Sequence, residues 1–304
     1  MLPLPITHKM HRSTCLPGFR HLPCALFLLL VAAAHAQKIT WSPSNLESGS
    51  PVLFKVDLNQ PASELHATWL NHTIAFTKAQ KGNTWYALAG IDVEQKPGTY
   101  PLDVTGGAVD GRPIQAKQDV AVLPGHYKTT TLHVEEKFVQ PDALTQQRIA
   151  ADKLVKDAAF SHPIAQPLWR GRFILPVPFT PTDSFGTRRM FNGELASIHR
   201  GTDFHAPSGT SVVAANDGVV IIAQGMFYEG NLVVVDHGQQ FSTLYMHLSK
   251  INVKVGDRVK KGQPLGLSGA TGRVTGPHLH LGVRWQGEYV DAVTLLRLQL
   301  PVIY

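Results

Sequence analysis

The stretch that decides the fold of the C-terminal half runs Pro277-His278-Leu279-His280-Leu281. In a β-strand, residues i and i+2 point to the same side, about 6.6 Å apart at the standard rise. The alternation therefore predicts a strand that sends the imidazoles of His278 and His280 into one cavity. Leu279 and Leu281 are expected to pack on the other side. A His-x-His strand alone is more often structural than catalytic, so its function must be judged together with the residues that precede it.

A second group precedes this strand in the sequence His199-Arg200-Gly201-Thr202-Asp203. A helix would bring positions i and i+4 together, but Gly201 and the β-rich flanks favour a loop that runs into a strand. Glycine tolerates backbone conformations that other residues avoid, so Gly201 is expected to supply the bend that directs His199 and Asp203 to one place.

A third group, Leu244-Tyr245-Met246-His247-Leu248, is another alternating strand end that presents one histidine. Zinc in proteins accepts neutral imidazole nitrogen and carboxylate oxygen at about 2.0–2.2 Å. The three groups together predict a zinc site in a β-rich segment with glycine turns. The residues themselves leave open whether His278 or His280 is the ligand.

Residues 185–292 closely resemble the catalytic domain of lysostaphin/LytM-type zinc endopeptidases, which hydrolyse peptidoglycan. The resemblance rests on the three groups above and on several runs between them, in the expected order. These runs are Ala206-Pro207-Ser208-Gly209-Thr210, Ala214-Ala215-Asn216-Asp217-Gly218-Val219-Val220, Asn231-Leu232-Val233-Val234-Val235-Asp236-His237-Gly238, Val255-Gly256-Asp257-Arg258-Val259 and Gly262-Gln263-Pro264-Leu265-Gly266. The most specific run is Gly269-Ala270-Thr271-Gly272-Arg273-Val274-Thr275-Gly276-Pro277-His278-Leu279-His280.

The resemblance implies a role for each residue of the predicted site. His199, Asp203 and His280 would hold one Zn²⁺ per chain, and His247 and His278 would be the catalytic histidines. Three protein ligands leave the fourth zinc position to water, whose pKa such a site lowers towards about 7.

Three further residues are candidates for the surroundings of this site. His205 lies two positions after Asp203 and is either a second-layer group or a substrate contact. Arg188 and Asn192, in the segment before His199, border the expected cleft or are ordinary turn residues.

The first 36 residues have the order of a secretory signal peptide. Lys9, Arg12 and Arg20 precede the apolar run 25–33, and Ala34-His35-Ala36 follows as a small-x-small cleavage site. An uncleaved membrane anchor is the alternative. The run is shorter than the roughly 20 residues that a spanning helix needs, so cleavage is favoured and the mature chain is expected to have no membrane span.

The cysteine content and the net charge exclude some classes of function. Both cysteines, Cys15 and Cys24, lie in the predicted signal peptide, so the mature chain would have no disulfide, thiolate ligand or cysteine nucleophile. Signal removal lowers the formal net charge from +6 to +3, because it removes three cations and no anion. A mild positive charge suits a polyanionic cell wall and argues against nucleic acid as a partner.

The predicted fold class is mainly β, in three parts after the signal peptide (1–36). Residues 37–125 are expected to form an immunoglobulin-like β-sandwich of about seven strands, with ranges 38–41, 52–58, 65–70, 73–78, 84–88, 99–104 and 114–122. Residues 126–170 form a linker with one amphipathic helix near 141–160, whose apolar positions are Leu144, Ile149, Leu154, Val155 and Ala158. Residues 171–304 form an all-β, LytM-like metallopeptidase domain.

The predicted function is hydrolysis of peptide cross-links in bacterial peptidoglycan by a secreted zinc metalloendopeptidase, periplasmic or extracellular. The D-alanyl–meso-diaminopimelate bond is the expected target, since the absence of wall-anchoring repeats favours a periplasmic enzyme. The alternative is a catalytically silent family member that activates another wall hydrolase. All five expected site residues are present, which favours the enzyme. Peptidoglycan is the expected partner, and protein partners are unknown.

Overall fold

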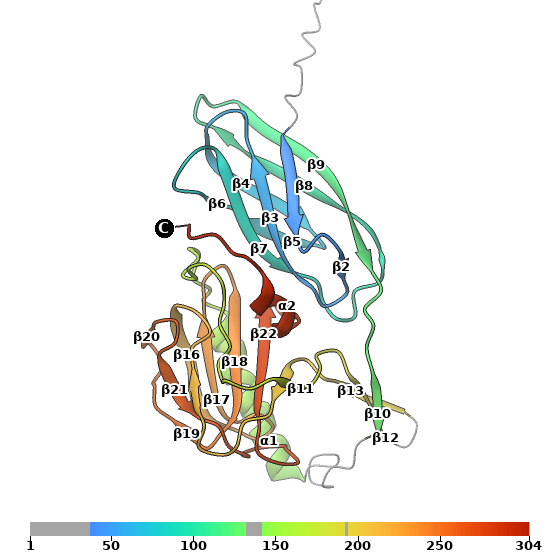
Figure 1. Cartoon of the computed structure of the whole chain (residues 1–304), viewed down its shortest axis with the longest axis vertical. Helices are drawn as coiled ribbons and strands as arrows, with labels where there is room; N and C mark the ends of the chain where they lie inside the picture. The colour runs from blue at the N-terminus through green and yellow to red at the C-terminus, as the bar shows by residue number, and fades with distance from the viewer. Residues whose placement is uncertain (1–36, 132–141, 192–193, 304) are drawn as a thin grey trace, which may run out of the picture. The chain divides into compact units, whose positions relative to one another are not determined.

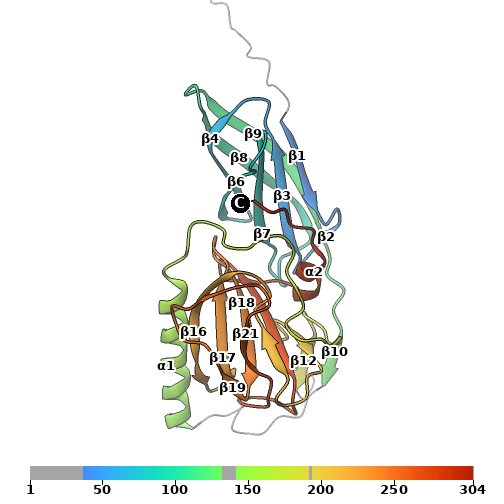
Figure 2. The same ribbon diagram turned by 60° about the vertical axis from the view of Figure 1, so that its left-hand side comes forward.

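The computed structural model describes residues 37–131, 142–191 and 194–303, which are mostly β-strands (Figures 1 and 2). The predicted signal peptide (1–36) and Asn192 lie outside the described residues. The prediction of a mainly β chain is confirmed. Neither helix in the described ranges is long and apolar enough to cross a membrane.

The N-terminal part is a sandwich of two sheets. Alternation of buried and exposed residues explains the packing: Leu65, Ala67 and Trp69 of one strand are buried while the residues between them are more exposed. The first sheet has the order β1 (Lys38–Ser42), β3 (Pro51–Asp57), β7 (Thr84–Gly90) and β6 (Thr77–Lys78). The second has the order β2 (Leu46–Glu47), β9 (Pro113–Leu123), β8 (Gly98–Ala108), β4 (Ala62–Trp69) and β5 (His72–Ala75).

The sandwich has nine strands where the sequence predicted about seven. One addition is β2, whose two residues are too few to show a period. The other arises because the predicted strand 73–78 is broken at Phe76. Its first half, β5, pairs with β4 in one sheet, and its second half, β6, pairs with β7 in the other. Because β5 and β6 are separated by one residue only, the sequence pattern predicts a single strand where the chain passes from one sheet to the other.

The C-terminal part is built on one large sheet, which positions the candidate site. Its order is β11 (Pro181–Asp183), β14 (Thr202–Phe204), β22 (Leu279–Trp285), β18 (Phe241–Leu248), β17 (Gly230–Asp236), β16 (Gly218–Met226) and β20 (Arg258–Val259), with β23 (Glu288–Tyr289) paired to β22. A second sheet has the order β15 (Ser211–Val213), β21 (Pro264–Leu267) and β19 (Lys250–Ile251). All of these pairings are antiparallel, and the side chains between the sheets are almost fully buried.

The segment that leaves the sandwich adds a strand to the C-terminal part. β10 (Thr129–Thr131) pairs in parallel with β12 (Arg188–Phe191), which pairs in turn with β13 (Glu194–Ile198) (Figure 1). The backbone N–H of Arg188 also donates to the carbonyl of Lys128 at 2.8 Å. The linker is therefore hydrogen-bonded to the strands that lead to His199.

Helix α1 (Ala143–Phe160) agrees in position with the predicted amphipathic helix, and it lies against β16 (Figure 2). The side chain of Asp142 caps it by accepting from the backbone N–H of Thr145 at 2.8 Å. The predicted apolar face was wrong in large part, because Leu144 is 77% and Leu154 68% exposed.

Polar contacts explain which face of α1 meets the sheet. Asp152 accepts a hydrogen bond from the backbone N–H of Phe227 at 2.7 Å, and Lys156 forms an ion pair with Glu229. These two residues share the inner face with Ile149 at helical spacing. Hydrogen bonds and an ion pair hold the helix as much as apolar burial does. A prediction based on hydrophobic periodicity alone therefore assigned exposed residues such as Leu144 and Leu154 to the buried face.

The expectation that residues 171–304 are entirely β was wrong at one place. Helix α2 (Ala292–Arg297) begins after Asp291, whose carboxylate accepts from the backbone N–H groups of Val293 and Thr294. Six residues are fewer than two helical turns, so no helical period is visible in the sequence.

A chain of buried polar groups joins the strands behind the site. His237, fully buried, lies 2.7 Å from the carbonyl of Asp217 and 2.8 Å from the hydroxyl of Thr243. The hydroxyls of Thr243 and Tyr245 lie 2.9 Å apart, and that of Tyr245 accepts from the backbone N–H of Ala215 at 2.7 Å. Burial lowers the pKa of His237 to about 4, so this histidine is neutral and structural.

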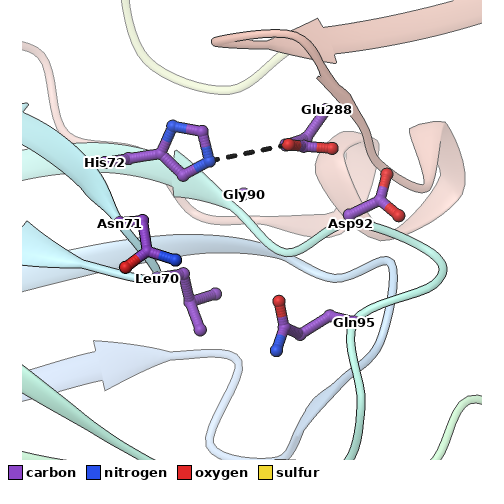
Figure 3. Close-up of a pocket in the computed structure, with 7 residues that line it drawn as sticks. All are labelled: Leu70, Asn71, His72, Gly90, Asp92, Gln95 and Glu288. Carbon is purple, nitrogen blue, oxygen red and sulfur yellow. Dashed lines mark ion pairs between the residues drawn. The ribbon is translucent and has the colours of Figure 1, made fainter.

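The described residues from 37 onward belong to one compact unit, in which charged side chains of the sandwich contact those of the C-terminal part. A cavity of about 320 Å³ lies at this contact, and His72 Nε2 is 3.6 Å from a carboxylate oxygen of Glu288. Figure 3 shows the residues that line the cavity. Asp92, on the same cavity, accepts a hydrogen bond from Arg200 at 3.2 Å. Burial, and then hydrogen bonding to and charge on Asp92, raise the pKa of Glu288 to about 7. The carboxyl groups of Glu288 and Asp92 are thus close together, and the raised pKa favours the protonated form of Glu288.

Candidate metal centre

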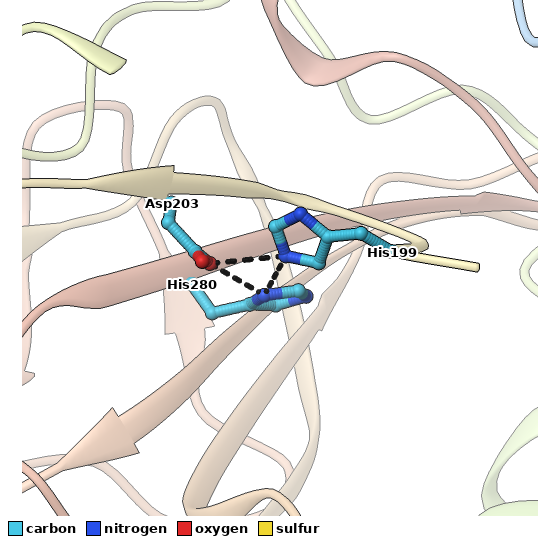
Figure 4. Close-up of side chains that lie close together, drawn as sticks. All are labelled: His199, Asp203 and His280. Atoms are coloured by element: carbon cyan, nitrogen blue, oxygen red, sulfur yellow. Dashed lines mark hydrogen bonds and ion pairs between the residues drawn. The ribbon is translucent and has the colours of Figure 1, made fainter. Parts of the chain in front are cut away.

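Three side chains converge at the end of the large sheet. His199 Nε2 lies 3.1 Å from Asp203 Oδ1 and 3.0 Å from His280 Nδ1, and Asp203 Oδ1 lies 2.8 Å from His280 Nδ1 (Figure 4). Their potential ligand atoms all lie within 4.8 Å of one another. Each side chain is less than 15% exposed. Two imidazoles and a carboxylate therefore form a compact, largely buried donor set.

Strand pairing brings these residues together from distant parts of the chain. β14 and β22 are antiparallel neighbours, and Asp203 lies directly opposite His280 in their register. His199 precedes β14 and is fixed by its backbone, because its N–H donates to the carbonyl of Thr187 and its carbonyl accepts from Gly186. The predicted loop running into a strand is what the structure contains.

Gly201 makes room for the site rather than bending the backbone. Its φ angle is not among the positive ones, so the conformational role proposed from the sequence is not needed. A Cβ atom on Gly201 would overlap His280 Nε2, and it would lie 2.5 Å from His280 Cε1 and 2.9 Å from the carbonyl of Leu281. The ring of His280 thus occupies the space that any larger residue at position 201 would fill.

Hydrogen bonds set the protonation of His199 and Asp203. His199 Nδ1 lies 3.1 Å from the carbonyl of Ser184, which can only accept, so Nδ1 carries the proton and Nε2 keeps its lone pair. Burial disfavours the charged form of Asp203, but its interactions with His199 and His280 outweigh that effect and hold the pKa of Asp203 well below its usual range. The carboxylate is therefore ionised, and burial likewise lowers the pKa of His280 and keeps it neutral.

A second pair of histidines lies beside this cluster. The ring centroids of His247 and His278 are 5.0 Å apart, and His278 Nε2 lies 3.6 Å from Asp203 Oδ1. Carbonyl groups again select the tautomer: His247 Nδ1 faces Thr271 O at 2.9 Å, and His278 Nδ1 faces Gly276 O at 2.8 Å. Both residues therefore keep a basic Nε2.

His247 has a backbone conformation that is unusual for histidine. Its φ is +64°, in the left-handed region that costs roughly 1–3 kcal/mol for such a residue. The strand is also irregular here, because the register between β17 and β18 shifts between Asn231 and Val233. Burial, then the neighbouring histidines His280 and His278, lower the pKa of His247 to about 3, so it is neutral. Strain and a strongly shifted pKa at one residue are typical of a functional position.

The remaining predicted residues are placed differently. His205 is exposed, and its ring meets Phe179 edge-on with centroids 6.3 Å apart. Arg188 is exposed on β12, whereas the next residue, Arg189, directs its guanidinium to within 3.8 Å of Asp203 Oδ2. Sequence reasoning missed Arg189, although two adjacent arginines on one strand must face opposite sides.

Family comparison agrees with this geometry. The profile of peptidase family M23 matches residues 197–292, which include the four histidines and the aspartate of the candidate site. Residues 197–292 therefore form a peptidase M23 domain, in agreement with the predicted resemblance to lysostaphin/LytM-type enzymes.

Several curated relatives are named as cell-wall enzymes. The peptidoglycan DD-endopeptidase ShyA of Vibrio cholerae is 53% identical over 113 residues, which cover 37% of this chain and 26% of that protein. The DD-carboxypeptidase/endopeptidase Mpg of Neisseria meningitidis is 41% identical over 123 residues, which cover 40% of this chain and 28% of that protein. The matched part spans about a quarter of the length of these relatives.

A solved structure matches more of the chain. The crystal structure of a putative peptidase M23 from Pseudomonas aeruginosa superposes with a TM-score of 0.60 at 29% sequence identity. The match covers 83% of this chain and 96% of that one, so it includes residues well outside the M23 segment.

Proposed function

We propose that the protein is a zinc metalloendopeptidase that hydrolyses the D-alanyl–meso-diaminopimelate cross-link of peptidoglycan outside the cytoplasm. One observation carries the proposal. His199, Asp203 and His280 place three ligand atoms within 4.8 Å of one another, beside His247 and His278, whose Nδ1 atoms face backbone carbonyls. A structural metal site would not need the two additional histidines.

The residues present fit a zinc ion. Ligand atoms around tetrahedral zinc lie roughly 3.3 Å apart, close to the 2.8–3.1 Å that separates the three donor atoms here. Two neutral imidazoles and one carboxylate form a zinc-type donor set, and the carbonyl of Ser184 orients His199 as a second-layer hydrogen-bond partner commonly does. When bound, zinc would act as a Lewis acid and lower the pKa of water.

The chain's own residues provide the proton transfers. Hydrolysis breaks the amide C–N bond, and water supplies hydroxyl to the D-alanyl carbonyl carbon and a proton to the departing amine. A neutral histidine with a free Nε2 can accept the proton of the attacking water and later pass it on. After protonation it can donate a hydrogen bond to the developing oxyanion. His278 is next to Asp203 and His247 next to His278, so both are positioned for these roles.

The names of the relatives support the substrate. A DD-endopeptidase cuts between two D-configured centres, and the cross-link from D-alanine to meso-diaminopimelate is such a bond. Peptidoglycan lies outside the inner membrane, so the proposal requires export, as the predicted signal peptide would provide. The sandwich is proposed to position or shield the peptidase part, since its charged side chains contact the loop that carries His199.

Incubation with purified cross-linked muropeptide dimers tests the substrate. We expect dimers to disappear and monomers to accumulate, with loss of the activity after chelation and its return with Zn²⁺. Intact dimers together with hydrolysis of glycine-rich bridges would refute the assigned bond. A zinc-loaded protein that cleaves neither would instead favour a catalytically silent activator of another hydrolase.

Single substitutions test the assignment of ligands and bases. Asp203→Ala or His280→Ala should remove zinc and activity together. His278→Ala or His247→Ala should keep most of the zinc and lose activity by about 10²- to 10⁴-fold, the usual contribution of a general base. If His278→Ala released the metal while His280→Ala retained it, the two roles would be reversed.

A further inference from the structure

The loop between β21 and β22 holds both candidate catalytic histidines by its backbone. The carbonyl of Thr271 accepts from His247 and the carbonyl of Gly276 accepts from His278. A single β-bridge between Gly269 and His278 closes the loop. In the sequence, Arg273 lies between Thr271 and Gly276, the two residues whose carbonyls accept these bonds. Its side chain is therefore carried by the loop that holds the two candidate catalytic histidines.

The position of Arg273 is fixed by the turn between β16 and β17. Its backbone N–H donates to the carbonyl of Tyr228 at 2.9 Å, and its guanidinium carbon lies 4.7 Å from the centroid of the Tyr228 ring. The preceding Gly272 has a φ of +78°, and a Cβ there would lie 2.6 Å from Tyr228 O. Backbone and ring together hold the guanidinium in one place before any ligand arrives.

No carboxylate among the described residues lies within ion-pair distance of the Arg273 guanidinium, and the side chain is exposed. Burial lowers the pKa of Arg273 and the positive charge of Arg189 acts in the same direction, whereas Tyr228 and the carboxylate of Glu229 raise it. Arg189 in turn lies 3.8 Å from Asp203. An exposed guanidinium that is held in place and has no ion-pair partner is suited to bind an anionic group of a ligand.

We propose that Arg273 binds the free carboxylate of the residue that supplies the nitrogen of the scissile amide. The inference rests on the proposed function. In the D-alanyl–meso-diaminopimelate bond, the carbon bonded to that nitrogen also bears a carboxylate. In a polyglycine bridge the same carbon is a CH₂ group next to an uncharged peptide carbonyl. Arg273 would thus be a specificity-determining residue that distinguishes the two kinds of cross-link by charge.

The test compares two dimers that differ at this carboxylate alone, one with the free acid and one with its carboxamide. The wild type, Arg273→Gln and Arg273→Lys are measured on both, and kcat/KM is determined. Arg258→Gln is the matched control, because Arg258 is an exposed arginine on β20 whose loss changes the net charge equally. Zinc content and melting temperature are recorded for every variant.

On the free-acid dimer, Arg273→Gln should lower kcat/KM by about 10- to 100-fold, the effect of losing a charge-assisted hydrogen bond. On the amidated dimer it should change kcat/KM by less than about twofold, and the wild type should cleave this dimer about 10- to 100-fold more slowly than the free acid. Arg273→Lys should fall between, because it keeps the charge and loses the planar fork. The control should match the wild type.

Equal losses on both dimers would overturn the inference, because Arg273 would then only shape the loop. If Arg273→Gln does not fold, the wild type decides alone: no preference for the free acid refutes the carboxylate contact. A wild type that cleaves neither dimer refutes the proposed function and this inference with it, which distinguishes that failure from a failure at Arg273.

Discussion

Gly201→Ala perturbs the metal centre without touching a ligand. The new Cβ would lie 2.5 Å from His280 Cε1, whereas carbon atoms in contact are about 3.5 Å apart, so the ring must move by about 1 Å. The carbonyl of Leu281, 2.9 Å away on the other strand, limits how far the backbone can shift instead. Such overpacking typically costs about 1–3 kcal/mol.

A displacement of this size is large for a metal ligand. His280 Nδ1 is 2.8 Å from Asp203 Oδ1, and ligand distances in zinc sites are kept within about 0.2 Å. We therefore expect zinc affinity to fall by about 10- to 100-fold, the range seen when ligand-orienting groups are lost. Competition with a chromophoric chelator measures the affinity, and metal content after dialysis provides a second reading.

Gly276→Ala is the matched control, since a Cβ at that position would have no atom within 4 Å and Gly276 is not among the glycines with positive φ. It should bind zinc as the wild type does. If Gly201→Ala also kept wild-type affinity, the space at position 201 would not be what His280 requires, and the steric reasoning would be refuted.

Three other predictions concern stability. The native pKa of Glu288 of about 7 exceeds its unfolded value near 4.5, so the native state binds more protons in this window and stability falls as pH rises through it. Glu288→Gln should therefore raise the melting temperature more at pH 8 than at pH 5, and an equal gain at both would contradict the pairing with Asp92. Tyr245→Phe leaves the buried N–H of Ala215 without its acceptor and should lower the free energy of unfolding by about 1–3 kcal/mol in urea titration. Arg200→Gln removes ion pairs of a 38% exposed side chain, so calorimetry should show a loss of no more than about 1 kcal/mol.

Local patterns were sufficient for much of the fold. Alternating apolar residues and glycine turns identify strands, and a polar stretch with a helical period identifies α1, since these signals depend on few neighbouring residues. The same local patterns predicted the wrong face of α1 to be buried. Asp152 and Lys156 on the inner face interact with Phe227 and Glu229, which are far away in the sequence. The local patterns also joined β5 and β6, which the structure separates at Phe76.

Sequence alone identified the types of residue at the site: two histidines in one strand, a histidine and an aspartate four apart, and a further histidine at a strand end. Those residue types predict metal chemistry wherever the chain brings them together. Only the tertiary structure decides which atoms meet. The register of β14 and β22 sets Asp203 opposite His280, and backbone carbonyls contributed by other loops select the tautomers of His199, His247 and His278. Tautomer, burial and the directions of Arg189 and Arg273 depend on contacts between segments far apart in the chain, which spacing along the sequence does not specify.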